Sequence, residues 1–323
     1  MPVLPRLIAH ADWSSNTKKR WICLAELDHQ GSYRVRVPKT VGNPQSLFTE
    51  LLKQADGGNV FAGFDFPIGL PSAYAEKIQI RDFRALLPEL GHGIWADFFE
   101  VARERDEIGP LRPFYPMTPG KKAGVRKQNH LVKALQTKSI EDLLRECEKS
   151  TDTRAAASSL FWTLGAKQVG KAAIVGWRDV LIPALQNSKV DVAIWPFDGS
   201  LFDLLSNHKI TVAETYPAEA CLHLCMSPPG RGWSKTNQAD RASKGKHIRN
   251  WLCSRKVDAE SQLLKMIGAG FGPSKDSEDP FDAFVGLLSM LEVVLGHRTP
   301  GESCVKQVRS IEGWILGQSA RGG

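Results

Sequence analysis

The sequence VFAGFDFP at positions 60–67 decides how the chain folds. Its first five residues, Val60 to Phe64, are apolar or glycine, which predicts a strand buried on both faces of a sheet. Three β-rich runs and one segment with helical spacing precede it, at residues 7–12, 20–27, 32–37 and 44–54. This strand–strand–strand–helix–strand order predicts a mixed sheet that is covered by helices on both faces.

Helical periodicity dominates the middle of the chain, residues 72–189. A proline-rich loop between Gly109 and Gly120 interrupts it. β-like runs then return at residues 190–197 and 210–216, and a last long helix is predicted from Pro280 to about Leu295.

Together these segments predict an α/β fold. We expect a mixed five-stranded sheet flanked by helices, in which three antiparallel meander strands are followed by parallel strands. Residues 1–71 and 190–323 would form this core, and residues 72–189 would be a helical insertion attached to the sheet.

The composition is that of a soluble globular protein, with 323 residues of which 42% are hydrophobic and 24% charged. The net charge of +7 and the pI of about 9.1 favour a polyanionic partner such as nucleic acid. The longest apolar stretch, residues 284–295, is too short to cross a bilayer, so we expect no membrane partner. The six scattered cysteines and the lack of an apolar signal core predict a cytoplasmic protein without structural disulfides.

Acidic residues stand at the edges of segments that otherwise have the composition of core. They are Asp12, Asp65, Glu214, Asp279 and Asp282. A carboxylate in such a place loses solvation and repels its neighbours unless a cation or a proton compensates it. Because the carboxyl ends of neighbouring parallel strands meet at one edge of a sheet, we expect these side chains to gather there.

Such a group predicts a metal centre with oxygen ligands. Asp12, Asp65, Asp279 and Asp282 are the predicted ligands, and Glu214 is a further ligand or a base beside them. Carboxylates suit Mg²⁺ or Mn²⁺, and two such ions about 4 Å apart can activate a water and stabilise the leaving oxygen of a phosphodiester. The last helix has an alternative interpretation, because Asp279 before a proline is also typical of an N-cap, with Asp282 in the first turn.

Basic and aromatic residues near these acids predict contacts to a substrate. A basic run between Gly230 and Arg249 precedes the last helix, and its position favours contact with phosphate over a merely solvated face. Lys235, which lies in this run, is also a predicted catalytic residue. The predicted substrate contacts are Lys235 and Arg241 at the scissile phosphate or leaving group, Trp13 stacked on a base, and Lys167 and Gln168 lining the cleft.

The order of these motifs resembles the ribonuclease H-like superfamily, and more narrowly an uncharacterised family of predicted nucleases with that fold. The residues that carry the resemblance are Ala11-Asp12, Phe64-Asp65-Phe66-Pro67-Ile68-Gly69, Glu214-Thr215-Tyr216-Pro217 and Asp279-x-x-Asp282-Ala283. The last of these is also similar to the final helix of RuvC-type Holliday-junction resolvases. The resemblance covers most of the chain and implies a metal-dependent nuclease that hydrolyses phosphodiester bonds in DNA or RNA.

Two other functions remain open from the sequence. One is a catalytically inactive module that binds nucleic acid through its basic surface. The other is a metal-dependent hydrolase or phosphotransferase that acts on a nucleotide or another small phosphorylated substrate. A kinase-like site is disfavoured, because Trp13-Ser14-Ser15-Asn16-Thr17 stands where a glycine-rich phosphate loop would follow the first strand.

Overall fold

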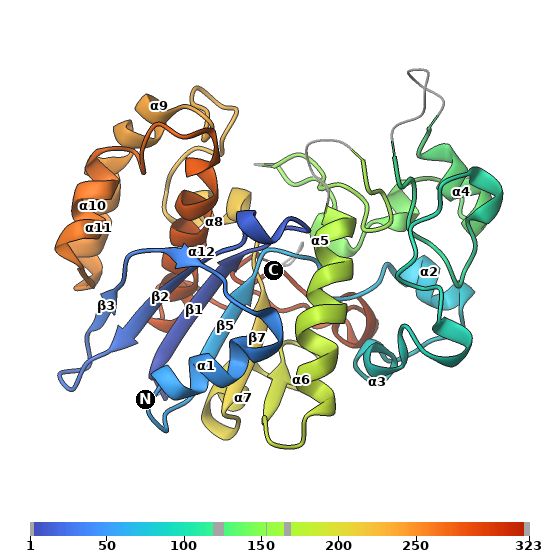
Figure 1. The fold of residues 1–323 in the computed structure, drawn as a ribbon, viewed down its shortest axis with the longest axis horizontal. Coiled ribbons are helices and arrows are strands. Elements are labelled where there is room, and N and C mark those ends of the chain that lie inside the picture. The colour runs from blue at the N-terminus through green and yellow to red at the C-terminus, as the bar shows by residue number, and fades with distance from the viewer. Residues whose placement is uncertain (1–2, 119–125, 153, 165–168, 320–323) are drawn as a thin grey trace.

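The fold is built on one mixed sheet, shown in a computed structural model that describes residues 3–118, 126–152, 154–164 and 169–319 (Figure 1). In these residues eight strands follow the order β6-β7-β5-β1-β2-β3-β8, with β4 paired to β2. The strands are β1 Leu7–Asp12, β2 Trp21–Leu27, β3 Tyr33–Val35, β4 Lys39–Thr40, β5 Val60–Phe64, β6 Val192–Ile194, β7 Ile210–Glu214 and β8 Asp258–Ala259.

The predicted α/β fold and its mixed sheet are confirmed. The sheet has more strands than the five predicted. The edge strand β6 lies within the β-like run predicted at residues 190–197, whereas the two-residue strands β4 and β8 were not predicted. Strands of two residues carry too little alternation to be recognised in a sequence. β1, β5, β7 and β6 run parallel to one another, while β2 is antiparallel to both β1 and β3.

The register decides which side chains share a face of the sheet. Ala11 pairs with Phe64, and Phe64 pairs with Glu214. Because side chains alternate along a strand, these three point to one face, and Asp12 and Asp65, one position further on, point to the other.

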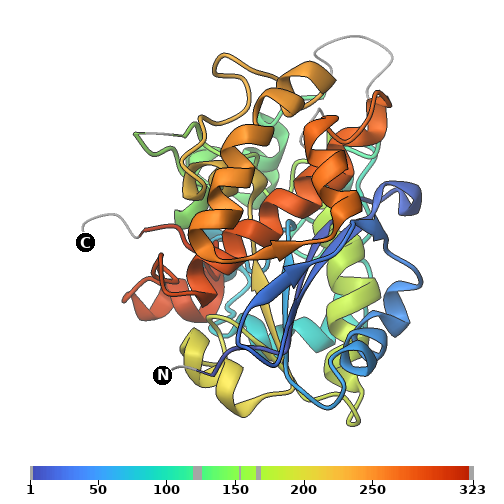
Figure 2. The ribbon, with the colours of Figure 1, turned by 90° about the vertical axis from the view of Figure 1, so that its left-hand side faces the viewer.

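Helices cover both faces of the sheet (Figure 2). α12 packs across β1 and β2 on the face of Asp12, and α8 packs against α12. α1 and the continuous helical stretch from α5 to α6 lie on the opposite face (Figure 1). The helices are α1 Leu47–Gln54, α2 Ser72–Lys77, α3 Phe83–Leu86, α4 Asn129–Leu135, α5 Val169–Gly176, α6 Ile182–Gln186, α7 Leu201–Asn207, α8 Pro217–His223, α9 Gln238–Ser243, α10 Gly245–Arg255, α11 Ser261–Gly268 and α12 Glu278–Val294.

The stretch from α5 to α6 was predicted as part of the insertion, but it packs on the sheet. A π-helical segment, Trp177–Leu181, joins the two helices. The indole N–H of Trp177 donates to the carbonyl of Pro67 at 2.7 Å, and Gly176 packs so closely on Phe66 that a Cβ there would clash. Among the described residues between 72 and 164, none belongs to the sheet, and α2, α3 and α4 lie beside it (Figure 1).

α12 lies unusually close to the central strands. The imidazole of His10 on β1 leaves no room for a Cβ at Gly286, and it bonds to the Ala283 carbonyl at 2.9 Å. This contact fixes the position of the acidic start of α12 relative to β1. Within the described part of the chain, no helix combines the length and the apolar character needed to cross a membrane.

Candidate active site

Asp12 and Asp65 lie side by side at the end of the central strands. Asp12 is the last residue of β1, and Asp65 directly follows β5. The Asp65 N–H donates to the Ala11 carbonyl at 3.4 Å, which continues the pairing of β1 with β5. The backbone N–H of Trp13 donates to Oδ1 of Asp65 at 2.6 Å. The two carboxyl groups are within hydrogen-bonding reach of each other, as the sequence predicted from the strand order.

Asp282 joins this pair from α12. It is buried, and its charge acts on both Asp12 and Asp65. The helix begins at Glu278 after a 3₁₀ turn, Lys275–Ser277, and Ser277 is its N-cap residue. The alternative in which Asp279 caps the helix and Asp282 follows in its first turn is therefore wrong. Asp279 is the second residue of the helix and lies in its first turn, and Asp282 lies beyond that turn.

Asp279 lies at the outer side of the group. Its carboxylate is half-buried, and its Oδ2 atom has no hydrogen-bond partner among the described residues. Burial raises the pKa of Asp279 to about 6, against the opposing charge of Lys19. Lys19 itself pairs with Asp276 at 2.7 Å. Of the four predicted ligands, Asp279 is thus the one with the weakest connection to Asp12 and Asp65.

Lys235 brings a positive charge into the group. Its ammonium contacts Oδ2 of Asp282 directly. Burial alone would lower the pKa of Lys235, but the carboxylates of Asp282 and Asp12 outweigh it and raise that pKa above its usual value. The structure therefore places Lys235 among the predicted site residues, while its contact with a phosphate stays a prediction.

Arg241 has a different role from the one predicted. Its side chain is buried, and its three guanidinium nitrogens all donate to backbone carbonyls. Nε and Nη2 bond to the carbonyls of Gly270 and Gly272, each at 2.9 Å, and Nη1 bonds to the carbonyl of Lys235. Arg241 therefore positions the backbone of Lys235, in place of the predicted contact with phosphate.

Glu214 stands apart from the aspartates, on the other face of the sheet. Both its oxygens accept from the guanidinium of Arg145 at 2.6 Å, and Oε2 also accepts from the Ile68 N–H at 2.7 Å. The alternation of side chains explains the difference from the predicted role as ligand or base, because Glu214 is in register with Phe64 and not with Asp65. Glu214 instead ties the sheet to the insertion.

Trp13 is a core residue and not an exposed platform for a base. It is only 5% exposed and packs edge-on against Phe64 and Phe66 at 5.7 and 5.9 Å between ring centroids. The guanidinium of Arg20 covers its ring at 4.4 Å. Its contribution to the site is the backbone N–H that holds Asp65. Lys167 and Gln168, predicted to line the cleft, lie outside the described residues.

Two buried residues that the sequence did not single out have structural roles. His10 positions the site, and Arg145 holds Glu214 on the other face of the sheet. His10 bonds to the Thr215 hydroxyl at 2.7 Å as well as to the backbone of α12. Burial lowers the pKa of His10 to about 4, so it is neutral at physiological pH. A histidine inside an apolar strand, two residues before Asp12, was the available signal. No signal in the sequence pointed to Arg145, the partner of Glu214, because its segment shows only ordinary helical spacing.

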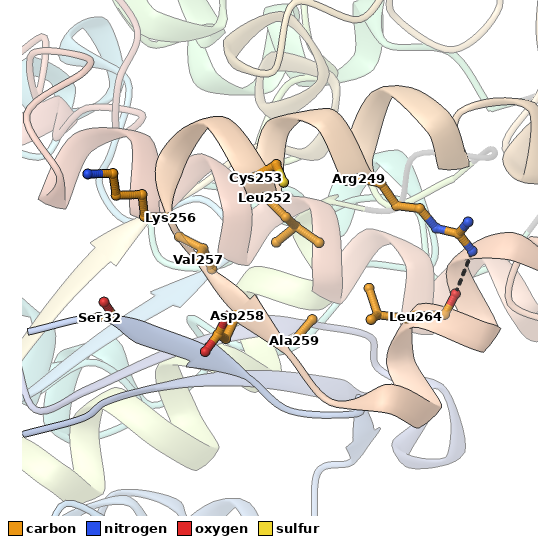
Figure 3. Close-up of a pocket in the computed structure, with 9 residues that line it drawn as sticks. All are labelled: Ser32, Arg249, Leu252, Cys253, Lys256, Val257, Asp258, Ala259 and Leu264. Carbon is orange, nitrogen blue, oxygen red and sulfur yellow. Dashed lines mark hydrogen bonds between the residues drawn. The ribbon is translucent and has the colours of Figure 1, made fainter. Parts of the chain in front are cut away.

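A groove at the far edge of the sheet contains none of the predicted site residues (Figure 3). It has a volume of about 530 Å³ and lies between α10, α11 and β8. Leu252, Val257 and Leu264 contribute to its apolar lining, and Arg249 bonds to the Leu264 carbonyl at 3.0 Å. The groove is therefore separate from the site formed by the aspartates.

Comparison with known proteins adds no relative. No protein family, curated protein or solved structure matches this chain. The resemblance to ribonuclease H-like nucleases remains an expectation from the motifs.

The aspartates fit a hard divalent cation by their chemistry. They offer only carboxylate oxygens, which Mg²⁺ and Mn²⁺ prefer. Among the described residues, no three His, Cys, Asp or Glu side chains are arranged as a ready metal cage. The carboxyl groups of Asp12 and Asp65 lie within hydrogen-bonding reach of each other, and Asp282 pairs with Lys235.

The burial of the two aspartates predicts an unusual pH dependence of stability. Burial, with the charges of Asp65 and Asp282, raises the pKa of Asp12, and burial raises the pKa of Asp65 to about 7. In the unfolded chain both groups titrate near ~3.9, so between about pH 4 and pH 7 the folded state binds more protons than the unfolded one. The free energy of unfolding of the cation-free protein therefore falls as the pH rises through this window.

We expect Asp65→Asn to make the free energy of unfolding fall less steeply as the pH rises. In the presence of a chelator, its melting temperature should exceed that of the wild type by roughly 2–4 °C at pH 8 and by much less at pH 5. Thermal unfolding at a series of pH values measures this difference. Parallel curves for the two proteins would mean that Asp65 does not carry a raised pKa.

Proposed function

We propose that this protein is a metal-dependent nuclease of the ribonuclease H-like superfamily, which acts on DNA or RNA in the cytoplasm. The observation that carries the proposal is the convergence of Asp12, Asp65 and Asp282 from two strands and a helix far apart in the sequence. Burying like charges together opposes folding unless a cation or a proton compensates them. A function for the cation explains why the chain keeps them there.

The strand order of the sheet supports the proposed membership of the ribonuclease H-like superfamily. The resemblance implies three meander strands followed by parallel strands, and β3-β2-β1-β5-β7 has that arrangement. Asp12 and Asp65 lie at the carboxyl ends of two of its parallel strands, which is where ligand sites form in open α/β sheets.

The reaction proposed is hydrolysis of a phosphodiester. The oxygen of a water bonds to phosphorus, the bond from phosphorus to the leaving oxygen breaks, and that oxygen takes up a proton. Asp12 and Asp65, beside Asp282, would hold Mg²⁺ or Mn²⁺, and the ion would supply an activated water and positive charge at the leaving oxygen. The backbone N–H of Trp13 keeps Asp65 oriented toward Asp12, and Lys235 places a positive charge at the same edge.

The surroundings of the site support a polyanionic substrate. Lys18 and Arg231 are exposed on the segments that follow β1 and precede Lys235. The ammonium of Lys244 stacks over Trp233 at 4.9 Å, near the same loop. Lysine and arginine side chains placed in this way bind phosphates independently of base sequence.

A cleavage assay tests the proposal. Purified protein is incubated with single- and double-stranded DNA, with RNA and with free nucleotides, in Mg²⁺, Mn²⁺ or chelator. We expect cleavage of a polynucleotide that depends on the divalent ion and stops in chelator. Turnover of nucleotides alone would favour the small-substrate alternative. Salt-sensitive binding of nucleic acid without cleavage would favour the inactive module, and either result would overturn the proposal.

A further inference from the structure

Lys235 brings a positive charge to the three buried aspartates of the group. Its ammonium contacts Asp282, and its charge also acts on Asp12 and Asp65. The pair is formed from two distant parts of the chain, the loop before α9 and the start of α12. The Asp282 side chain is buried, whereas that of Lys235 is 36% exposed, so the ammonium can also meet a bound substrate.

The loop that carries Lys235 is held on both sides of it. Before Lys235, Trp233 packs edge-on against Phe281, with 6.1 Å between ring centroids, and its indole N–H donates to the Ser227 carbonyl at 2.8 Å. The Ser234 N–H donates to the Asp240 carboxylate at 2.8 Å. These contacts anchor the loop next to Asp282 itself, because Phe281 is the preceding residue of α12.

After Lys235, the buried guanidinium of Arg241 fixes the backbone. It donates to the Lys235 carbonyl and to two carbonyls of the turn after α11, those of Gly270 and Gly272. An arginine with its donors used in this way holds the loop at Lys235 and the turn after α11 in one geometry. Lys235 is therefore a pre-positioned charge and not a mobile surface lysine.

From this geometry we propose that Lys235 takes the place of a second metal ion. The site would bind one divalent ion, through Asp12 and Asp65, and the Lys235 ammonium on Asp282 would be the fixed second positive charge. A second ion at Asp282 would share that carboxylate with the ammonium, and the two positive charges would repel each other. This inference rests on the proposed function for the first ion and departs from the two-ion site expected from the sequence.

The ammonium has a defined task in this arrangement. During hydrolysis, negative charge develops on the oxygens of the phosphoryl group and on the leaving oxygen. A pre-positioned lysine stabilises that charge without having to reorganise, and it acts as a point charge toward phosphate. Lys235 thus supplies by a protein side chain what a second ion supplies in two-metal sites.

Counting bound Mn²⁺ tests the inference without measuring activity. Calorimetric titration, with free Mn²⁺ followed by electron paramagnetic resonance, is done on the wild type, Lys235→Met and Lys235→Arg. We expect one ion per chain in the wild type and in Lys235→Arg, which keeps the charge, and a second ion in Lys235→Met, where Asp282 is released. Lys149→Met, which removes a lysine paired with Glu146 in the insertion, is the matched control and should bind one ion.

Activity gives a second readout of the same variants. Cleavage by Lys235→Met should be slower by on the order of 10²-fold at low Mn²⁺ and should recover partly at high Mn²⁺, as the second ion replaces the lost charge. Two ions on the wild type, or one ion on both the wild type and Lys235→Met, would overturn the role of Lys235 while leaving the nuclease function intact. No Mn²⁺ on any of the proteins would contradict the metal-dependent function itself.

Discussion

Asp12→Asn and Asp65→Asn should each lower the rate of divalent-ion-dependent cleavage by about 10²–10³-fold. Each substitution removes one of the two carboxylates that face each other at the ends of β1 and β5. A bound ion is worth several kcal/mol to the transition state, and a loss of ~3–4 kcal/mol corresponds to this factor. Initial rates of cleavage at saturating Mn²⁺ measure it.

The fold should survive both substitutions. Asparagine has nearly the size of aspartate, and at position 65 its amide oxygen can still accept the Trp13 N–H. Asp28→Asn is the matched control, because Asp28 is an exposed turn residue that accepts from the N–H groups of Gln30 and Ser32. It should cleave at the wild-type rate. Full activity of Asp12→Asn or Asp65→Asn would show that the substituted aspartate has no role in catalysis.

Arg145→Met should reduce the free energy of unfolding by about 3–5 kcal/mol. Arg145 is fully buried and bonds to Glu214 twice, to Glu148 at 2.9 Å, and to the carbonyls of Ile68 and Glu312. Without the guanidinium, two buried carboxylates lose their counter-charge. Denaturant-induced unfolding measures the effect.

Two further proteins separate loss of charge from loss of packing. In Arg145→Met combined with Glu214→Gln, one unpaired carboxylate is gone, so part of the stability should return. Lys149→Met, which breaks the exposed pair with Glu146, should change stability by no more than about 0.5 kcal/mol. If Arg145→Met were as mild as Lys149→Met, the buried network would not be what joins the insertion to the sheet.

Much of the sheet could be predicted because its central strands carry the strongest patterns. The run at 60–64 is apolar or glycine throughout, the run at 7–12 is mostly apolar, and the observed bounds of both equal those predicted. The two-residue strand β8 follows a helix without any pattern of its own, and its pairing with β3 depends on tertiary packing. The helical stretch 169–186 has clear periodicity, but periodicity does not say which surface a helix will cover.

The sequence could predict only those site residues that lie at the ends of recognisable strands. Asp12 and Asp65 were found because parallel strands bring their carboxyl ends together. Glu214 also ends a strand, yet it belongs to the other face, because a shift of one position reverses the direction of a side chain. Arg241 looked like a phosphate ligand in a basic run, and only the folded chain surrounds its guanidinium with carbonyls.

Anomalous diffraction from a crystal of the wild-type protein soaked in Mn²⁺ is the most direct measurement of the central claim. We expect an anomalous peak bound by the carboxylates of Asp12 and Asp65, and its loss in Asp65→Asn crystals soaked in the same way. The absence of a peak at these carboxylates in the wild type, or a peak there that is unchanged in Asp65→Asn, would contradict it.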